Sequence, residues 1–460
     1  MILSSLPAAS LRQAFVRRTL SPVEALAAVK LRVEACEPRL HALWAVDFEA
    51  AEARARASEA RYRAGAPLGP LDGVPLTIKE NLATSGLSMP LGTAASDMAP
   101  SAADAPPVAR ARAGGLVDFA RTTMPDYGML SSGLSSFHAL ARNPWDVSKT
   151  PGGSSSGAGA AGAAGYGPLH IGTDIGGSVR LPAGWCGLFG LKPSLGRIPI
   201  DPPFQGRAAG PMTRTVEDAA LFMRVLAQPD PRDHMSLPPA DIDWDDLELD
   251  PKGLRIGLLM EAGCGLPVEP ETAAAVEAAA RVFADAGAHV EPMKPFLTRA
   301  MLDGQDRFWR ARGWSDMRAL PAERKAKILP FIRAWIETAA GYSGEDVYSG
   351  FAQSMAIRKT TDEATRLYDF VLSPTAPIAA FPAELASPTD DPQRPFEHIA
   401  FTLPYNMSEQ PAATINCGYT SGGLPIGLQI AGRRFDDLGV LRLSRFYEQA
   451  RPAQRPWPEG

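Results

Sequence analysis

The fold and the site are decided by the stretch from Lys149 to Lys192, which is K-T-P-G-G-S-S-S-G-A-G-A-A-G-A-A-G-Y-G-P-L-H-I-G-T-D-I-G-G-S-V-R-L-P-A-G-W-C-G-L-F-G-L-K. It joins a glycine- and serine-rich loop, a segment of small residues, and a second glycine pair that ends in Ser178. Glycine loses more backbone freedom on folding than any other residue, so such a stretch is costly to order. That cost is tolerated where the backbone must approach a ligand closely. We therefore expect a buried polar site that is built largely from main chain.

One alternative for this stretch is dinucleotide binding, because Gly157, Gly159 and Gly162 form G-x-G-x-x-G. That motif requires a strand directly before it and an acidic residue about 20 positions later. Here the strand-breaking residues 150–153 precede it, and the nearest acid, Asp174, comes too early. The pattern disfavours a nucleotide cofactor.

A second alternative is the nucleophile elbow of α/β-hydrolases, because residues 153–157 fit G-x-S-x-G around Ser155. The elbow requires a buried strand that leads into it, and an acid followed by a histidine downstream. Pro151 interrupts the approach, which weakens this hypothesis. Three later histidines remain as candidate bases: His234, His289 and His398.

The third alternative is a pair of serines assisted by a lysine. A serine hydroxyl is a poor nucleophile at its ordinary pKa and needs a base within hydrogen-bond reach, and lysine serves in some variants of the catalytic triad. The lysine must be neutral, and lowering its pKa from ~10.4 to near 7 or 8 by burial costs about 4 kcal/mol. The chain should therefore hold a lysine inside an apolar segment. Lys79 meets this condition, because it ends the strand-like run V-P-L-T-I at residues 74–78.

The lysine and the serines lie in three longer motifs: G-V-P-L-T-I-K-E-N at 73–81, P-G-G-S-S-S-G at 151–157, and G-T-D-I-G-G-S-V-R-L-P-A at 172–183. Together these motifs resemble the amidase signature family of Ser-Ser-Lys hydrolases. The resemblance covers nearly the whole chain and includes G-P-M-T-R-T-V-E-D at 210–218, S-P-T-A-P at 373–377 and G-G-L-P-I-G-L-Q-I at 422–430.

The resemblance implies a role for each member of the triad. Ser178 is expected to be the nucleophile, Ser154 the proton relay, and Lys79 the terminal base and later the acid. A hydroxyl suits the relay because it both donates and accepts a hydrogen bond. The resemblance also implies a cis peptide bond between Gly153 and Ser154.

Around the triad, the resemblance implies an oxyanion hole and a set of supporting residues. It assigns neither a cofactor nor a metal. Asp174 and Arg180 fit two hypotheses, a structural ion pair or a pair that tunes Lys79. The expected oxyanion donors are the main-chain N–H groups of Ile175, Gly176, Gly177 and Ser178. The expected supporting residues are Ser155, Thr173, Asp174 and Arg180.

The same resemblance implies an α/β fold, a single large domain in which an α/β/α sandwich surrounds a mixed, mostly parallel twisted sheet. We expect one amidase-type domain over 1–460, with N-terminal helices at 8–64 packed on it. The proline- and acid-rich residues 228–253 are expected to be a surface excursion rather than a linker. Strand signals at 254–259 and 288–291, with a helix signal at 271–286 between them, predict a βαβ unit with parallel pairing.

Composition excludes several functional classes. A net charge of −5 and a pI near 5.8 leave no basic footprint for nucleic acid. Four scattered cysteines without a C-x-x-C pair favour reduced thiols and therefore a reducing compartment. The N-terminus lacks the features of a signal peptide, and no apolar run approaches the ~18 residues of a membrane-spanning helix. We expect a cytoplasmic protein, a monomer or homodimer, that contacts no membrane.

The expected substrate is a small molecule with an amide or a carbamate bond. The chain is similar in overall look to metagenomic urethanases of the family, which also cleave amides. Two alternatives stay open, the amide-cleaving subunit of a tRNA-dependent amidotransferase and a non-catalytic binding scaffold. The tRNA-dependent subunit normally has an aspartate just before F/L-T-x-P, where this chain has His398 in H-I-A-F-T-L-P. Aromatic residues at 296–345 are expected to be core, with some of them lining the substrate pocket.

Overall fold

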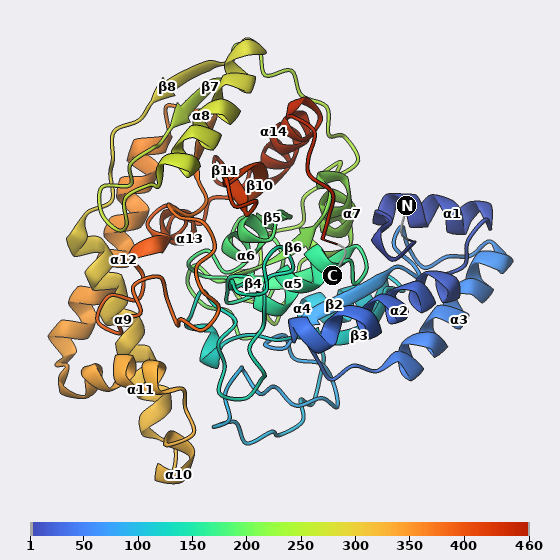
Figure 1. The fold of residues 1–460 in the computed structure, drawn as a ribbon, viewed down its shortest axis with the longest axis horizontal. Helices are drawn as coiled ribbons and strands as arrows, with labels where there is room; N and C mark the ends of the chain where they lie inside the picture. Colours follow the sequence, from blue (N-terminus) through green and yellow to red (C-terminus); the bar gives the residue numbers. More distant parts are fainter. Residues whose placement is uncertain (1–2, 459–460) are drawn as a thin grey trace.

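The computed structural model describes residues 3–458 and is organised around one mixed sheet of eleven strands (Figure 1). In spatial order the strands are β1 (Leu43–Trp44), β3 (Val117–Thr122), β2 (Pro75–Lys79), β4 (Leu169–Asp174), β6 (Ala208–Thr213), β5 (Phe189–Lys192), β10 (Ala412–Tyr419), β11 (Pro425–Gly432), β9 (Phe370–Pro374), β7 (Arg255–Leu258) and β8 (His289–Pro292).

The helices begin or end largely where the sequence carries capping residues. Ser21 forms a capping box with Glu24, and Thr215 accepts a hydrogen bond from the Asp218 N–H. The α-helices are α1 (Ala8–Arg17), α2 (Pro22–Leu40), α3 (Phe48–Ala64), α4 (Pro106–Ala113), α5 (Ser156–Ala164), α6 (Arg180–Trp185), α7 (Val216–Leu226), α8 (Pro270–Asp285), α9 (Arg299–Arg318), α10 (Ala322–Lys325), α11 (Pro330–Glu337), α12 (Gly344–Thr365), α13 (Leu403–Met407) and α14 (Asp437–Ala450), with 3-10 turns at η1 (Leu3–Ser5), η2 (Asp126–Gly128), η3 (Thr338–Gly341) and η4 (Glu397–Ile399).

Side chains alternate between the two faces of the sheet and bury apolar surface on both. Leu76 and Ile78 of β2 belong to a core that includes residues of α4 and α7. Val117 and Phe119 of β3 belong to a second core with α2, α3 and α5. The sheet is therefore covered on both sides, and the expected α/β class with a mixed sheet is confirmed.

The expected predominance of parallel pairing is wrong. Four neighbouring pairs are parallel and six are antiparallel, and the antiparallel pairing runs unbroken from β4 to β9 through the centre of the sheet. The parallel pairs are those that βαβ units build, such as β7 with β8 around α8. β10 and β11 are joined by residues 420–424 alone, and a connection this short allows only antiparallel pairing.

The small-residue segment of the deciding stretch forms α5, and all nine of its residues are buried. A Cβ on Gly157 would lie 2.1 Å from the carbonyl oxygen of Ala42 and 2.4 Å from the N–H nitrogen of Thr123. The absence of side chains thus lets neighbouring backbone approach α5. The glycines of the G-x-G-x-x-G pattern lie inside this buried helix, so they form no loop for a dinucleotide.

Figure 1 shows α9 to α12 at one end of the molecule and α1 to α3 at the other. Residues 227–254 link α7 to β7 without a helix or strand, and Trp244 within them is buried in the same core as β2. Between residues 3 and 458, no helix is long and apolar enough to cross a membrane.

Candidate active site

Lys79 is the last residue of β2, a strand that is buried along its whole length. Its side chain is completely buried, and Nζ donates to Ser154 Oγ at 2.8 Å and to Ser155 Oγ at 3.0 Å. Burial lowers the pKa of Lys79 to about 7, and the positive charge of Arg207 lowers it further, while Asp174 and Glu80 act in the opposite direction. A large part of the Lys79 population is therefore uncharged near neutral pH.

Ser154 lies in the loop that leads into α5, and the Gly153–Ser154 peptide bond is cis. A Cβ on Gly153 would lie 2.6 Å from the Ser132 N–H nitrogen and 2.7 Å from the Leu130 carbonyl oxygen. Only glycine fits at that position. The packed backbone therefore fixes the loop that presents the Ser154 hydroxyl to Lys79.

Ser178 follows β4 in the turn that leads to α6, and its side chain is partly exposed. The Ser155 N–H donates to the Ser178 carbonyl oxygen at 3.1 Å, which ties the two serine loops together. Within residues 3–458, no hydrogen bond joins the hydroxyls of Ser178 and Ser154 directly. Both residues line the same cavity. A rotation of the Ser178 side chain toward Ser154 is needed to complete a relay.

The turn before Ser178 exposes main-chain N–H groups. Asp174 accepts from the N–H of Gly177 at 2.8 Å and from that of Val179 at 3.0 Å, so its carboxylate holds the turn in shape. Gly177 is thereby engaged and drops out of the expected set of oxyanion donors. The N–H groups of Ile175, Gly176 and Ser178 donate to no other described residue.

Asp174 and Arg180 form a completely buried ion pair at 2.9 Å. Burial raises the pKa of Asp174, but Arg180 more than offsets this, and the net effect holds the pKa well below its usual range. Arg180 also donates to Gln429 Oε1 at 2.7 Å and to Asn406 Oδ1 at 2.6 Å. The pair therefore anchors the turn to the C-terminal part of the sheet, and its effect on Lys79 is secondary.

Thr173 and Ser155 support Lys79 from below. The Thr173 carbonyl oxygen accepts from Ser155 Oγ at 3.3 Å and from Lys79 Nζ at 3.5 Å. Thr173 Oγ1 accepts from Asn81 Nδ2 at 2.9 Å. The buried Oδ1 of Asn81 has no partner among the described residues, and Asn81 lines the cavity beside Ser154. It is an open acceptor next to the serines.

Two hollows meet at Ser178. The wider one, about 390 Å³, contains Ser154, Asn81, Arg207 and Arg312 in its lining. The narrower one, about 30 Å³, has largely apolar walls and lacks Ser154. Trp309, Phe396 and Ile399 are among its walls, together with Gly176 and Ser178.

Several of these lining residues are not predictable from the sequence patterns. Asn81 ends the motif at 73–81, but that motif assigns it no role, and nothing in the sequence points to Arg207, Arg312, Phe204 or Phe396. They lie far from the triad in sequence, and no local pattern separates them from surface or core residues. Trp309 belongs to the aromatic segment that is expected to supply some pocket walls.

The histidine base of the elbow hypothesis is absent from the site. His398 is completely buried, its ring packs near that of Trp185 with 6.1 Å between centroids, and it lines neither hollow. Burial lowers the pKa of His398 to about 3, so the ring is neutral. Ser155, the serine of the elbow pattern, donates its hydroxyl to the Thr173 carbonyl and lines neither hollow.

Comparison with known proteins agrees with this geometry. Residues 24–441 match the family model described as Amidase. A glutamyl-tRNA(Gln) amidotransferase subunit of Roseiflexus sp. (strain RS-1) is 35% identical over 485 residues, which are 97% of this chain and 97% of that protein. A bacterial aryl acylamidase of the amidase signature family superposes with a TM-score of 0.90 at 29% identity and covers 97% of this chain and 96% of its own. The peptide amidase of Stenotrophomonas maltophilia superposes with a TM-score of 0.84 at 25% identity, over 98% of each chain. The chain is therefore a member of the amidase signature family.

Proposed function

We propose that this chain hydrolyses the C–N bond of linear amides through an acyl-enzyme on Ser178. The observation that carries the proposal is the contact of 2.8 Å between a completely buried Lys79 and the Ser154 hydroxyl, in a cavity that also contains Ser178. A buried amine with a pKa near 7 is a suitable base at neutral pH, since catalytic groups work best when their pKa lies near the operating pH.

In the first half of the reaction, the lone pair of neutral Lys79 accepts the Ser154 proton while Ser154 accepts that of Ser178. The Ser178 oxygen attacks the carbonyl carbon, and the carbonyl oxygen becomes an oxyanion. The free N–H groups of Ile175, Gly176 and Ser178 lie in the turn beside it and are proposed to bind this charge. One donor of this kind is worth about 10²–10³ in rate.

In the second half, the tetrahedral intermediate collapses and the C–N bond breaks. The proton returns from Lys79 through Ser154 to the departing nitrogen, so the amine leaves neutral. Water then attacks the acyl carbon of the Ser178 ester and gives its proton to the same relay. The products are the carboxylic acid and free serine. Each step uses only groups that line the cavity or touch Ser154.

Carbamates are proposed as a second substrate class. A carbamate and an amide pass through similar tetrahedral intermediates, so the same residues serve both. The test compares 4-nitroacetanilide with ethyl 4-nitrophenylcarbamate, because C–N cleavage of either releases 4-nitroaniline. We expect turnover of the anilide by the purified chain alone, and Ser178→Ala as the control must abolish it. If the chain releases no 4-nitroaniline from either compound, the proposal is wrong.

The second candidate function is that of an amidotransferase subunit, which is favoured by the 35% identity to such a subunit over nearly the full chain. His398 stands against it, since that subunit normally has an aspartate at this place. Activity that appears only when the other subunits of an amidotransferase are added would favour this candidate. Turnover of anilides by the isolated chain would favour the first.

A further inference from the structure

The wider hollow at the serines contains two arginines that have no carboxylate partner. Arg207 and Arg312 are both partly buried and line the cavity with Ser154 and Ser178. Among residues 3–458, neither forms an ion pair within 4.0 Å. Arginine is almost never buried without a partner for its charge. Something other than a protein carboxylate is therefore expected to face these two groups.

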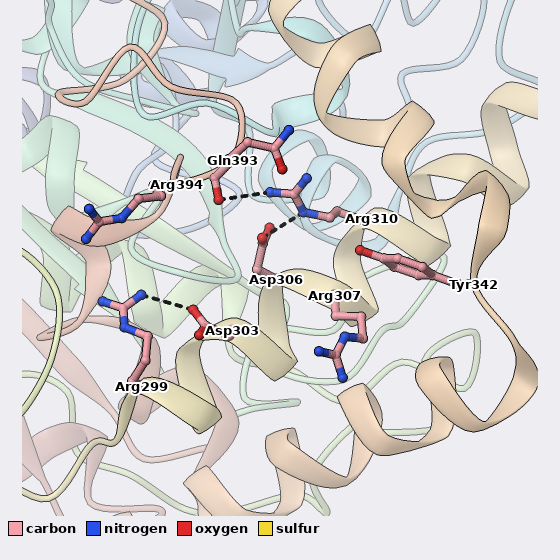
Figure 2. A pocket seen from close by; sticks show the side chains of 8 residues that line it. All are labelled: Arg299, Asp303, Asp306, Arg307, Arg310, Tyr342, Gln393 and Arg394. Carbon is pink, nitrogen blue, oxygen red and sulfur yellow. Dashed lines mark hydrogen bonds and ion pairs between the residues drawn. The ribbon is translucent and has the colours of Figure 1, made fainter.

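A second charged hollow shows what paired arginines look like in the same molecule. This hollow, about 420 Å³, lies along α9 and the loop near residue 393 (Figure 2). Arg299 contacts Asp303 at 3.0 Å and Glu397 at 2.7 Å, and Arg310 contacts Asp306 at 2.7 Å. Arg394 contacts Glu397 at 3.2 Å. Its charges are largely compensated internally, so it gives no indication of a ligand.

The two cavity arginines instead contact weak or neutral partners. Arg312 lies over the ring of Phe204 at 4.9 Å and points Nη2 at Met129 Sδ at 3.4 Å. Arg207 donates to the Pro202 carbonyl oxygen at 3.3 Å. Burial lowers the pKa of both groups, that of Arg312 to about 10.

Two carboxylates do line this cavity, and neither neutralises the arginines. Asp174 is committed to Arg180 and to the turn before Ser178. Asp316 is exposed, and its charge raises the pKa of Arg312 without reaching ion-pair distance. A guanidinium held flat against a ring keeps the N–H groups of its edge available, and that edge matches the two oxygens of a carboxylate.

The relay decides which part of the substrate occupies this cavity. The departing amine must receive its proton from Ser154, and of the two hollows at Ser178 only the wider one has Ser154 in its lining. The amine part of the substrate therefore lies beside Arg207 and Arg312, and the acyl part faces the narrow apolar hollow.

We propose that the preferred substrates are amides whose amine part carries a carboxylate, which Arg207 and Arg312 bind together. This inference rests on the proposed amide hydrolysis at Ser178. It narrows the substrate class to short-chain N-acyl derivatives of amino acids or aminobenzoates.

The test uses chromogenic anilides that differ only in charge: 5-acetamido-2-nitrobenzoate, its methyl ester, and 4-nitroacetanilide. We expect kcat/KM for the carboxylate to exceed that for the methyl ester by about 10-fold or more, since a charge pair shielded from water is worth more than 1.4 kcal/mol, the equivalent of tenfold. N-(4-nitrophenyl)succinamate carries its carboxylate on the acyl side instead, and we expect it to be a poorer substrate than 5-acetamido-2-nitrobenzoate.

Variants locate the effect on the arginines. Arg312→Gln should lower the carboxylate-to-ester ratio of kcat/KM by about 10–100-fold, and Arg312→Lys should restore part of it, because lysine keeps the charge without the planar fork. Arg307→Gln, on the same helix but outside the cavity, is the matched control and should leave the ratio unchanged.

A ratio near one in the native chain, an equal ratio in Arg312→Gln, or a preference for the succinamate would each overturn the inference. Turnover of 4-nitroacetanilide in the same assay would show that amide hydrolysis itself still stands. Loss of turnover on all four compounds would instead remove the proposed function.

Discussion

Two lysines of this molecule, Lys79 and Lys192, have nearly the same surroundings by every measure except their partners. Each ends a strand of the sheet and is buried, with 0% and 1% of the residue exposed. Burial lowers the pKa of each to about 7. Lys79 contacts two serine hydroxyls, whereas Lys192 donates to the carbonyl oxygen of Pro193 at 2.8 Å. A low pKa is thus insufficient for a base, which also needs a hydroxyl that opens into a cavity.

The most severe way to break this comparison is to remove each amine while keeping its volume. Lys79→Met should lower kcat/KM on an anilide by about 10⁴-fold or more, because a base that acts as a unit with its nucleophile accounts for most of the chemical step. Lys192→Met should stay within a few-fold of the native value. Steady-state assays of both variants, with Ser178→Ala as the floor, decide the point. Equal losses in the two lysine variants would show that Lys79 is only structural.

Asp174 sharpens the comparison, because its charge raises the pKa of both lysines while it holds the turn before Ser178. Asp174→Asn should lower kcat by about 10²–10³-fold, since the oxyanion donors lose their orientation. It should also destabilise the fold by about 3–5 kcal/mol, because Arg180 is left as a buried charge without its partner. Assays on folded protein, confirmed by circular dichroism, separate the two effects. An unchanged kcat would remove the assigned role of the turn.

The pH dependence of the reaction tests which lysine titrates in catalysis. The free enzyme is active when Lys79 is neutral, so kcat/KM should rise with pH through an apparent pKa near 7 and level off above it. Below that value the rate should fall about tenfold per pH unit. Lys192→Met should show the same profile, since that amine touches neither serine. A profile that is flat from pH 5 to 9 would contradict a lysine base.

The triad residues were predictable because their chemistry is local in the sequence. A lysine at the end of an apolar strand is unusual, and the glycines around Ser154 and Ser178 mark backbone that must pack closely. Lys192 follows a similar apolar run, L-F-G-L, and sequence alone does not separate it from Lys79. What separates them is which loops fold over each amine, and this depends on contacts between distant parts of the chain.

The fold was predictable in class and wrong in detail for a related reason. Periodicity and capping residues define individual elements such as α8 between β7 and β8, because those signals lie within about 20 residues. The pairing of β4 with β6 and of β5 with β10 depends on where long connections return to the sheet. Arg207 and Arg312 were missed likewise, because only the folded chain brings them beside Ser154.

The smallest expected effect concerns stability and isolates Lys192 from catalysis. Its pKa is about 7 in the folded chain and 10.5 by default when unfolded, so between these values the unfolded chain binds more protons and stability rises with pH. Below pH 7 the full cost of burying the amine is present. Lys192→Met removes this cost, so its melting temperature should exceed that of the native protein by a few degrees at pH 7. The difference should shrink as the pH approaches 10, when the native amine is neutral in both states. Melting curves of the two proteins at pH 7, 8.5 and 10 measure this trend. A difference that is constant across the three values would mean that Lys192 is already neutral, or fully compensated by Asp437 and Glu409, at pH 7.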